Sequence, residues 1–192
     1  MYGEKGTQAR EGDPKLPTNP YGSTKLSAEN WLRLYKDIYD LDYVTLRYFN
    51  VYGSRQRAGS PYAGVIANWA HSLLMQKPLV VFGDGKQTRD FIHVSDVVRA
   101  NVKAIDVPTT GFTTYNICSE SKTSLNTILN HLRMITRYTF TIKYEEARKG
   151  EVQDSSGVNV RARVGLEWEP ATNLYDGLQS LLQWRGVECK IE

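Results

Sequence analysis

Short segments rich in β-branched and aromatic residues alternate with amphipathic segments, and this alternation restricts the possible folds more than any other feature of the sequence. Runs such as YVTLRYF at 43–49 and LVVF at 79–82 are typical of strands. Apolar residues at spacings of three and four are typical of helices. The predicted strands are residues 43–49, 79–82, 113–118 and 140–146, and the predicted helices are residues 21–39, 65–74, 95–105, 125–135 and 174–184. Such alternation predicts an α/β protein with at least part of a parallel sheet.

Local signals place several element ends. Asn19 and Pro20 are typical of an N-cap and a first helical residue. Pro78 should end the second helix, and Thr123 or Ser124 should cap the fourth. Residues 1–20 are rich in glycine and proline and are predicted to form a loop.

Charge and composition exclude several classes of protein. The net charge is +3, and the 24 lysines and arginines are scattered, so no nucleic-acid partner is expected. No apolar run approaches the ~20 residues of a membrane span, and the N-terminus lacks the apolar core of a signal peptide. Cys118 and Cys189 form no CxxC pair, so a cytoplasmic location is expected. The three histidines are isolated, so no metal site is expected.

Tyr21 and Lys25 are four positions apart at a helix start, so both side chains share one face. A tyrosine with its ordinary pKa of about 10 is a poor base at neutral pH. A neighbouring ammonium group favours the phenolate and lowers that pKa. Such a pair can remove a proton from a sugar hydroxyl, although a surface tyrosine packed on a lysine stem is the simpler interpretation of the pattern taken alone.

Four further motifs follow this pair in order and cover most of the chain. The five motifs are Pro20–Lys25 (PYGSTK), Arg47–Gly53 (RYFNVYG), Gly83–Val94 (GDGKQTRDFIHV), Tyr115–Ile117 (YNI) and Arg148–Glu151 (RKGE). With these motifs the sequence resembles the extended short-chain dehydrogenase/reductase family, and within it the nucleotide-sugar 4-epimerases that interconvert UDP-glucose and UDP-galactose. The resemblance implies an incomplete Rossmann-like parallel sheet, without its N-terminal strands, joined to a smaller α/β substrate-binding domain.

The resemblance also implies a division of the chain. Residues 1–53 would be the C-terminal part of an NAD-binding Rossmann domain. Residues 54–192 would mainly form the domain that binds the nucleotide sugar, with about 93–138 returning to the Rossmann part. A homodimer is usual in the family.

Family roles map onto individual positions. Tyr21 would be the catalytic base, Lys25 would hold the nicotinamide ribose, and Phe49 would lie against the nicotinamide of NAD. The sugar 4-hydroxyl would lose its proton to Tyr21 while the C4 hydride passes to NAD, and a 4-keto sugar would turn over before the hydride returns. The residues expected to contact the UDP-sugar are Asn50, Val65, Phe82, Arg89, Arg148 and Glu151. In this set Phe82 would stack on the uracil, and the two arginines would bind the diphosphate.

Each of these positions also has a structural interpretation. Phe82 could be a core residue of its strand, and Asn50 could be a turn residue. Arg89 could form a local ion pair with Asp90. Asn116 is expected to be a structural hydrogen-bonding residue.

The family binds NAD through a glycine-rich turn, and neither GxGxxG nor GxxGxxG occurs in this sequence. The family's catalytic Ser or Thr precedes a Val-Tyr-Gly triplet, whereas this sequence opens with Met1-Tyr2-Gly3. We therefore expect the C-terminal portion of an epimerase that is inactive by itself. Strands 43–49 and 113–118 would then expose edges or apolar faces, which would favour a rearranged core, association with another chain or poor solubility.

Two alternatives stay open. A nucleotide-sugar 4,6-dehydratase or decarboxylase of the same family would share these motifs, although Arg47–Asn50 and Ser60–Tyr62 resemble the epimerases more closely. A non-catalytic remnant that only binds nucleotide sugars would also retain them.

Overall fold

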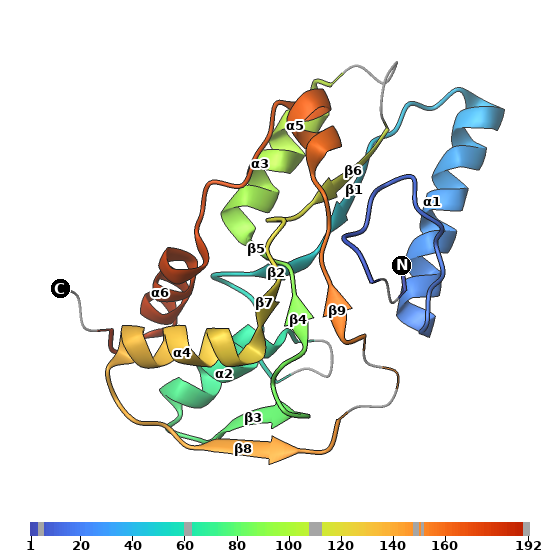
Figure 1. The fold of residues 1–192 in the computed structure, drawn as a ribbon. Helices are drawn as coiled ribbons and strands as arrows, with labels where there is room; N and C mark the ends of the chain where they lie inside the picture. The colour runs from blue at the N-terminus through green and yellow to red at the C-terminus, as the bar shows by residue number, and fades with distance from the viewer. Residues whose placement is uncertain (4–5, 60–62, 108–112, 148–149, 151, 190–192) are drawn as a thin grey trace.

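A computed structural model describes residues 1–3, 6–59, 63–107, 113–147, 150 and 152–189 of the protein. The helices are α1 (Pro20–Tyr39), α2 (Val65–Leu74), α3 (Val94–Ile105), α4 (Leu125–Thr136), α5 (Val160–Leu166) and α6 (Leu174–Arg185). The strands are β1 (Thr45–Tyr48), β2 (Asn50–Tyr52), β3 (Leu79–Phe82), β4 (Thr88–Arg89), β5 (Phe91–His93), β6 (Thr114–Ile117), β7 (Thr123–Ser124), β8 (Ile142–Glu145) and β9 (Asp154–Ser155). The predicted α/β class is confirmed, and Figure 1 shows its arrangement.

The strands pair mainly in parallel. β1 pairs with β6, β2 with β5, and β3 with β8, each in parallel. β4 lies between β7, which is antiparallel to it, and β9, which is parallel. Parallel pairs require long connections between their strands, and here these connections carry the helices.

The predicted strand 43–49 is shorter in the structure, and β2 follows it as a separate strand. Phe49 interrupts the run, because its N–H donates to Ile117 O whereas the next N–H, from Asn50, donates to Asp90 O. The backbone thus changes pairing partner between these two residues. The other short strands and α5 were not predicted, because two- or three-residue strands and a seven-residue helix carry too little periodicity.

Two apolar cores hold the fold together. The larger one joins α2, α4, α6 and β3, with Trp69, Leu79, Leu129 and Leu181 almost fully buried. The smaller one joins β6 to α3 and α5 and includes Trp168. In Figure 1, α3 and α5 lie on one side of the β1–β6 pair and α1 lies on the other.

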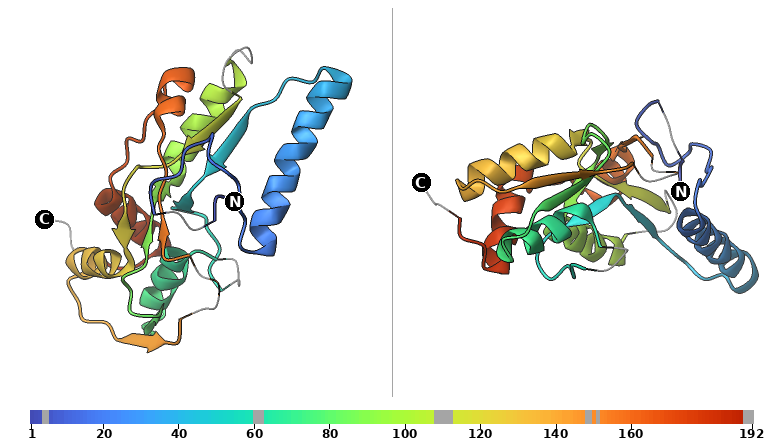
Figure 2. Two further views of the ribbon diagram at one scale, coloured as in Figure 1. Left: turned by 45° about the vertical axis from the view of Figure 1, so that its right-hand side comes forward. Right: turned by 90° about the horizontal axis from the view of Figure 1, so that it is seen from below.

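Helix α1 lies at the margin of the molecule, as both views of Figure 2 show. Gly22 is its only buried residue. Its large exposed apolar or aromatic side chains are Tyr21, Trp31, Leu34, Tyr35, Ile38 and Tyr39. Val98, Val102 and Ile105 of α3 and Tyr48 of β1 are also exposed. Exposed apolar surface near the strand 43–49 was expected from the sequence.

Candidate active site

Tyr21 and Lys25 lie in the first two turns of α1. The helix begins as predicted, with Pro20 as its first residue and the Asn19 side chain accepting a hydrogen bond of 2.8 Å from the Gly22 N–H. Tyr21 is 64% exposed, and the Lys25 Nζ atom lies 5.2 Å from the centre of its ring. The structure therefore brings the ammonium group to the face of the phenol ring, at a surface that a ligand can reach.

A buried ion pair fastens α1 to β1. Arg47 donates from Nε and Nη2 to the two carboxylate oxygens of Glu29, at 2.7 and 2.6 Å. The Arg47 and Glu29 side chains are only 7% and 14% exposed. The Arg47 Nη1 atom also donates to Tyr2 Oη at 2.5 Å and to Glu11 O at 3.1 Å. The bidentate contact between Arg47 and Glu29 sets the position of the helix that carries Tyr21 and Lys25.

Phe49 and Asn50 lie together at the carboxyl end of β1. The Phe49 ring stacks on Tyr2, with centroids 6.4 Å apart and planes at 26°. The ring also lies close to Gly157. A Cβ atom added at residue 157 would lie only 2.4 Å from Phe49 Cζ, so a larger residue would collide with the ring. The Asn50 Nδ2 atom donates to Asp90 O at 3.0 Å, so its Oδ1 atom is the part of the amide that can accept a hydrogen bond from a ligand.

The aromatic ring of Tyr2 links Phe49 to the other site elements. Its hydroxyl donates to Asn116 Oδ1 at 2.6 Å and accepts from Arg47. Burial raises the pKa of Tyr2 to about 12, despite the nearby Arg47. The phenol is therefore neutral at physiological pH and acts here as a structural hydrogen-bonding group.

Phe82 and Arg89 come from neighbouring parts of the chain, at the ends of β3 and β4. Leu79 and Val81 of β3 are fully buried, whereas Phe82 is only partly buried and lies outside both cores. The structural interpretation of Phe82 as a core residue is therefore wrong. The Arg89 Nη1 atom donates to Thr88 O at 2.8 Å and to Gln153 O at 3.1 Å, which holds the guanidinium group against β4 and the segment before β9.

The remaining predicted substrate contacts are distributed. Val65 is the first residue of α2 and packs against the larger core, so its side chain has a clear structural role. Arg148, Glu151 and the segment 60–62 lie outside the described residues. Asn116 is fully buried, and its Nδ2 atom donates to Ala9 O and Val158 O, so the structural role expected for it is confirmed.

His93 serves as the N-cap of α3. Its Nδ1 atom lies 2.7 Å from Ser95 Oγ, and its ring meets Tyr52 edge-on with centroids 5.3 Å apart. Partial burial lowers the pKa of His93. Within the described part of the chain, no cluster of three or more His, Cys, Asp or Glu side chains could hold a metal ion. None of the helices in the described ranges is long and apolar enough to cross a membrane.

Two surface hollows lie near Asn50 and Gly157 in the sequence. One, of about 310 Å³, is lined by Val94 and by residues 51–56, immediately after Asn50. The other, of about 340 Å³, is lined by Val158 and by residues near the start of the chain. Neither hollow is lined by Tyr21, Lys25 or Phe82.

Several residues that build the site were not predicted. Tyr2, Glu29, Arg47 and Gly157 surround Phe49 or hold α1 in place. An arginine within an otherwise apolar strand was a usable signal, because a buried guanidinium group requires an acidic partner. The contact between Gly157 and Phe49 had no such signal, since it joins segments far apart in the sequence.

Comparison with known proteins assigns the family. The model described as "NAD dependent epimerase/dehydratase family" matches residues 1–118, which is more than half of the chain. The chain therefore belongs to this family.

Individual relatives agree with that assignment. The chain is 32% identical to a putative UDP-glucose 4-epimerase of Methanocaldococcus jannaschii, covering 96% of this chain and 59% of the relative. It is 30% identical to a UDP-N-acetyl-alpha-D-glucosaminuronate decarboxylase of Bacillus cytotoxicus, covering 96% and 60%.

Solved structures share the fold. A UDP-glucose 4-epimerase of Thermotoga maritima, solved with UDP-glucose, matches with a TM-score of 0.88 and 36% identity, over 95% of this chain and 59% of that one. A UDP-glucuronic acid 4-epimerase of Bacillus cereus, solved with UDP-glucuronic acid and NAD, matches with a TM-score of 0.87 and 32% identity, over 96% and 58%. The chain thus spans less than two thirds of the length of each of these proteins.

Proposed function

We propose that this chain supplies the substrate-binding part and the Tyr–Lys pair of an NAD-dependent UDP-sugar 4-epimerase. The observation that carries the proposal is the placement of Tyr21 and Lys25 together on an exposed helix start, with that helix fastened to β1, directly after which Phe49 and Asn50 follow. Tyr21 would accept the proton of the sugar 4-hydroxyl, and Lys25 would support that transfer with its positive charge.

The remaining residues would bind the two ligands. Phe82 offers a partly buried ring for the nucleobase, and Arg89 would bind the diphosphate together with Arg148. Asn50 would accept a hydrogen bond from the substrate through Oδ1, with Val65 and Glu151 completing the set. We further propose that residues 1–53 belong to the cofactor-binding domain and 54–192 mainly to the substrate domain, with about 93–138 returning to the former. The two separate cores support a division into two parts, but their membership differs from these bounds: α4, within 93–138, packs in the larger core, and α5 packs in the smaller one.

The residues at the start of α1 fit one end of NAD. Lys25 and Tyr21 are exposed polar groups suited to ribose hydroxyls, and the Phe49 ring, stacked on Tyr2 with its edge against Gly157, is held in place as an apolar wall for a nicotinamide ring would be. When bound, NAD would supply the acceptor and later the donor of the C4 hydride. The sequence offers no glycine-rich turn for the pyrophosphate, so we expect this chain by itself to bind NAD poorly and to be inactive.

Two other functions follow from specific observations. The decarboxylase relative of similar identity supports a decarboxylase, or a dehydratase of the same family, as a second candidate. A chain that only binds nucleotide sugars is a third candidate, because Phe82 and Arg89 could contact a nucleotide sugar without any catalytic step. An assay of product from UDP-glucose and from UDP-glucuronic acid separates the candidates, because epimerisation, loss of water and loss of carbon dioxide give products of different mass or sugar composition.

Calorimetry on the 192-residue chain tests the ligand-binding part of the proposal. We expect UDP-glucose to bind, and Arg89→Gln to weaken its affinity about tenfold through loss of a charged hydrogen-bonding group. Lys143→Gln, which removes an exposed charge on β8, serves as the matched control and should leave the affinity unchanged. Micromolar binding of NAD to this chain would contradict our expectation for the cofactor, and equal UDP-glucose affinity in both variants would contradict the role of Arg89.

We also propose that the exposed apolar face of α1 mediates association of the chain, as a homodimer. Trp31 and Ile38 are 62% and 66% exposed, and Gly22 is the only residue of this helix that is buried. Sedimentation should show concentration-dependent association that Trp31→Glu together with Ile38→Glu abolishes. The matched control is Val164→Glu, on an exposed position of α5, which should leave association unchanged. Strong amide protection of β1 and β6 in a dilute monomer would contradict the expectation that these strands need a partner.

A further inference from the structure

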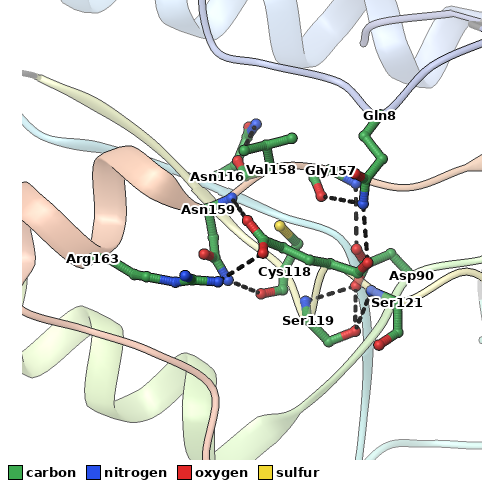
Figure 3. A network of polar contacts seen from close by, with 11 residues as sticks. Gln8, Asp90, Asn116, Cys118, Ser119, Ser121, Gly157, Val158, Asn159 and Arg163 are labelled. Carbon is green, nitrogen blue, oxygen red and sulfur yellow. Dashed lines mark hydrogen bonds and ion pairs between the residues drawn. The ribbon is translucent and has the colours of Figure 1, made fainter.

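Asp90 is a fully buried carboxylate that has no part in the chemistry described above. It lies between β4 and β5, and Figure 3 shows it at the centre of a polar network. Its Oδ1 atom accepts from Ser119 N and Ser119 Oγ, at 2.7 and 2.8 Å, and its Oδ2 atom accepts from Gly157 N at 3.3 Å. Burial raises the pKa of Asp90 to about 6, so the group is mainly ionised at neutral pH and both oxygens can accept hydrogen bonds.

The two turns that Asp90 contacts are also joined to each other. Glu120 Oε1 accepts from Asn159 N at 2.7 Å. The Gln8 Nε2 atom donates to both Glu120 O and Gly157 O, at 2.9 and 3.2 Å (Figure 3). Because these bonds link the turn after β6 to the turn after β9, a change at either turn is transmitted to the other.

This network reaches two of the proposed site residues. Gly157 lies directly against the Phe49 ring, so a shift of residue 157 must move the ring or open a gap beside it. The Asp90 carbonyl oxygen accepts from both the backbone N–H and the Nδ2 atom of Asn50, at 2.9 and 3.0 Å. Asp90 therefore contacts Asn50 directly and Phe49 through one residue.

We propose that Asp90 is a positioning residue, whose carboxylate fixes the turns at Ser119 and Gly157 and thereby sets the Phe49 ring and the Asn50 amide in place. The inference rests on the proposed function for the identity of the ligand that these two side chains meet. The contacts that carry it do not depend on that identity.

The test replaces Asp90 with asparagine, which keeps one acceptor oxygen and places an NH2 donor against either the two Ser119 donors or the Gly157 N–H. Asp96→Asn is the control, since Asp96 is equally buried and also accepts backbone hydrogen bonds, from Ala171 and Thr172; it pairs in addition with Arg99, so its replacement disturbs at least as many contacts. Under folding conditions we expect the amides of Asn50, Ser119 and Gly157 to exchange about tenfold faster in Asp90→Asn than in Asp96→Asn. Equal exchange rates in the two variants would overturn the proposal.

A second measurement asks whether this loosening affects ligand binding. Calorimetry with UDP-glucose, at a temperature where every variant is folded, should show about tenfold weaker binding in Asp90→Asn and unchanged binding in Asp96→Asn. Faster exchange with equal affinities would reduce Asp90 to a structural role. If the unchanged protein does not bind UDP-glucose, the proposed function fails, whereas the exchange experiment still decides whether Asp90 holds Phe49 and Asn50. If Asp90→Asn does not fold, Ser119→Ala can be used instead, because it removes only the hydroxyl donor to Asp90. It should also speed amide exchange at Asn50 and Gly157 and weaken UDP-glucose binding, but by smaller factors.

Discussion

Replacing Arg47 with alanine should lower the free energy of unfolding by about 3 kcal/mol, because the largely buried Glu29 carboxylate loses its bidentate partner and keeps only the Lys15 ammonium group at 3.9 Å. The same change should release α1, whose other contacts with the body are few. Urea unfolding measures the first effect. Amide exchange measures the second, as a loss of protection along α1 that exceeds the loss in α4.

Arg163→Ala is the control for that experiment. Arg163 also pairs with a glutamate at 2.7 Å, but its side chain is 49% exposed, so its removal should cost only about 0–1 kcal/mol. Replacing Arg47 and Glu29 together with methionine and leucine should restore most of the lost stability, because no charge is then left buried. If Arg47→Ala lowered the free energy of unfolding by as little as Arg163→Ala does, the buried pair would not be what holds the helix.

The role of Tyr21 can be tested in any form of the protein that shows epimerase activity, since the 192-residue chain by itself is expected to be inactive. In such a form Tyr21→Phe should lower kcat by about 10²–10⁴-fold, because it removes the hydroxyl that would take the substrate proton. Binding of NAD should be nearly unchanged, because the ring and its contact with Lys25 remain. The measurements are the rate of UDP-galactose formation from UDP-glucose and a fluorescence titration with NAD.

Tyr39→Phe gives the matched comparison, since Tyr39 is a similarly exposed tyrosine at the other end of the same helix. Its kcat should equal that of the unchanged protein. Turnover by Tyr21→Phe at a comparable rate would refute the assignment of Tyr21 as the base. A parallel loss of NAD binding would instead indicate that the hydroxyl acts mainly in holding the cofactor.

The long elements were predictable from the sequence because each carries its own local signal. Asn19 and Pro20 mark the start of α1, and Ser124 accepts from Thr127 N as the cap of α4. The β-branched and aromatic residues of LVVF predicted β3 with its observed limits. These features depend on neighbours within one or two turns, which the sequence states directly.

The arrangement around Phe49 could not be predicted in the same way. The roles of Gly157 and Asp90 depend on the pairing of β4 with β9 and on the turn after β6, which bring together residues from three distant parts of the chain. Arg47 was visible as an unusual residue in its strand, but its partner could have been any acidic side chain. Family resemblance supplied candidate roles for Tyr21 and Phe82, and the contact between Tyr21 and Lys25 was predictable from their spacing on one helix.

The parallel pairing of the strands in the described residues has a consequence for how the protein folds. Each parallel pair joins strands separated by a long stretch of chain, as Thr45 with Thr114 and Leu79 with Ile142. Closing such loops costs chain entropy before any strand contact compensates for it, so this topology predicts slow folding, dominated by non-local contacts. Helix α1 can form early from local interactions alone. During synthesis, the β3–β8 pair cannot form until residue 142 and its neighbours have left the ribosome, and the larger core must also wait for α6.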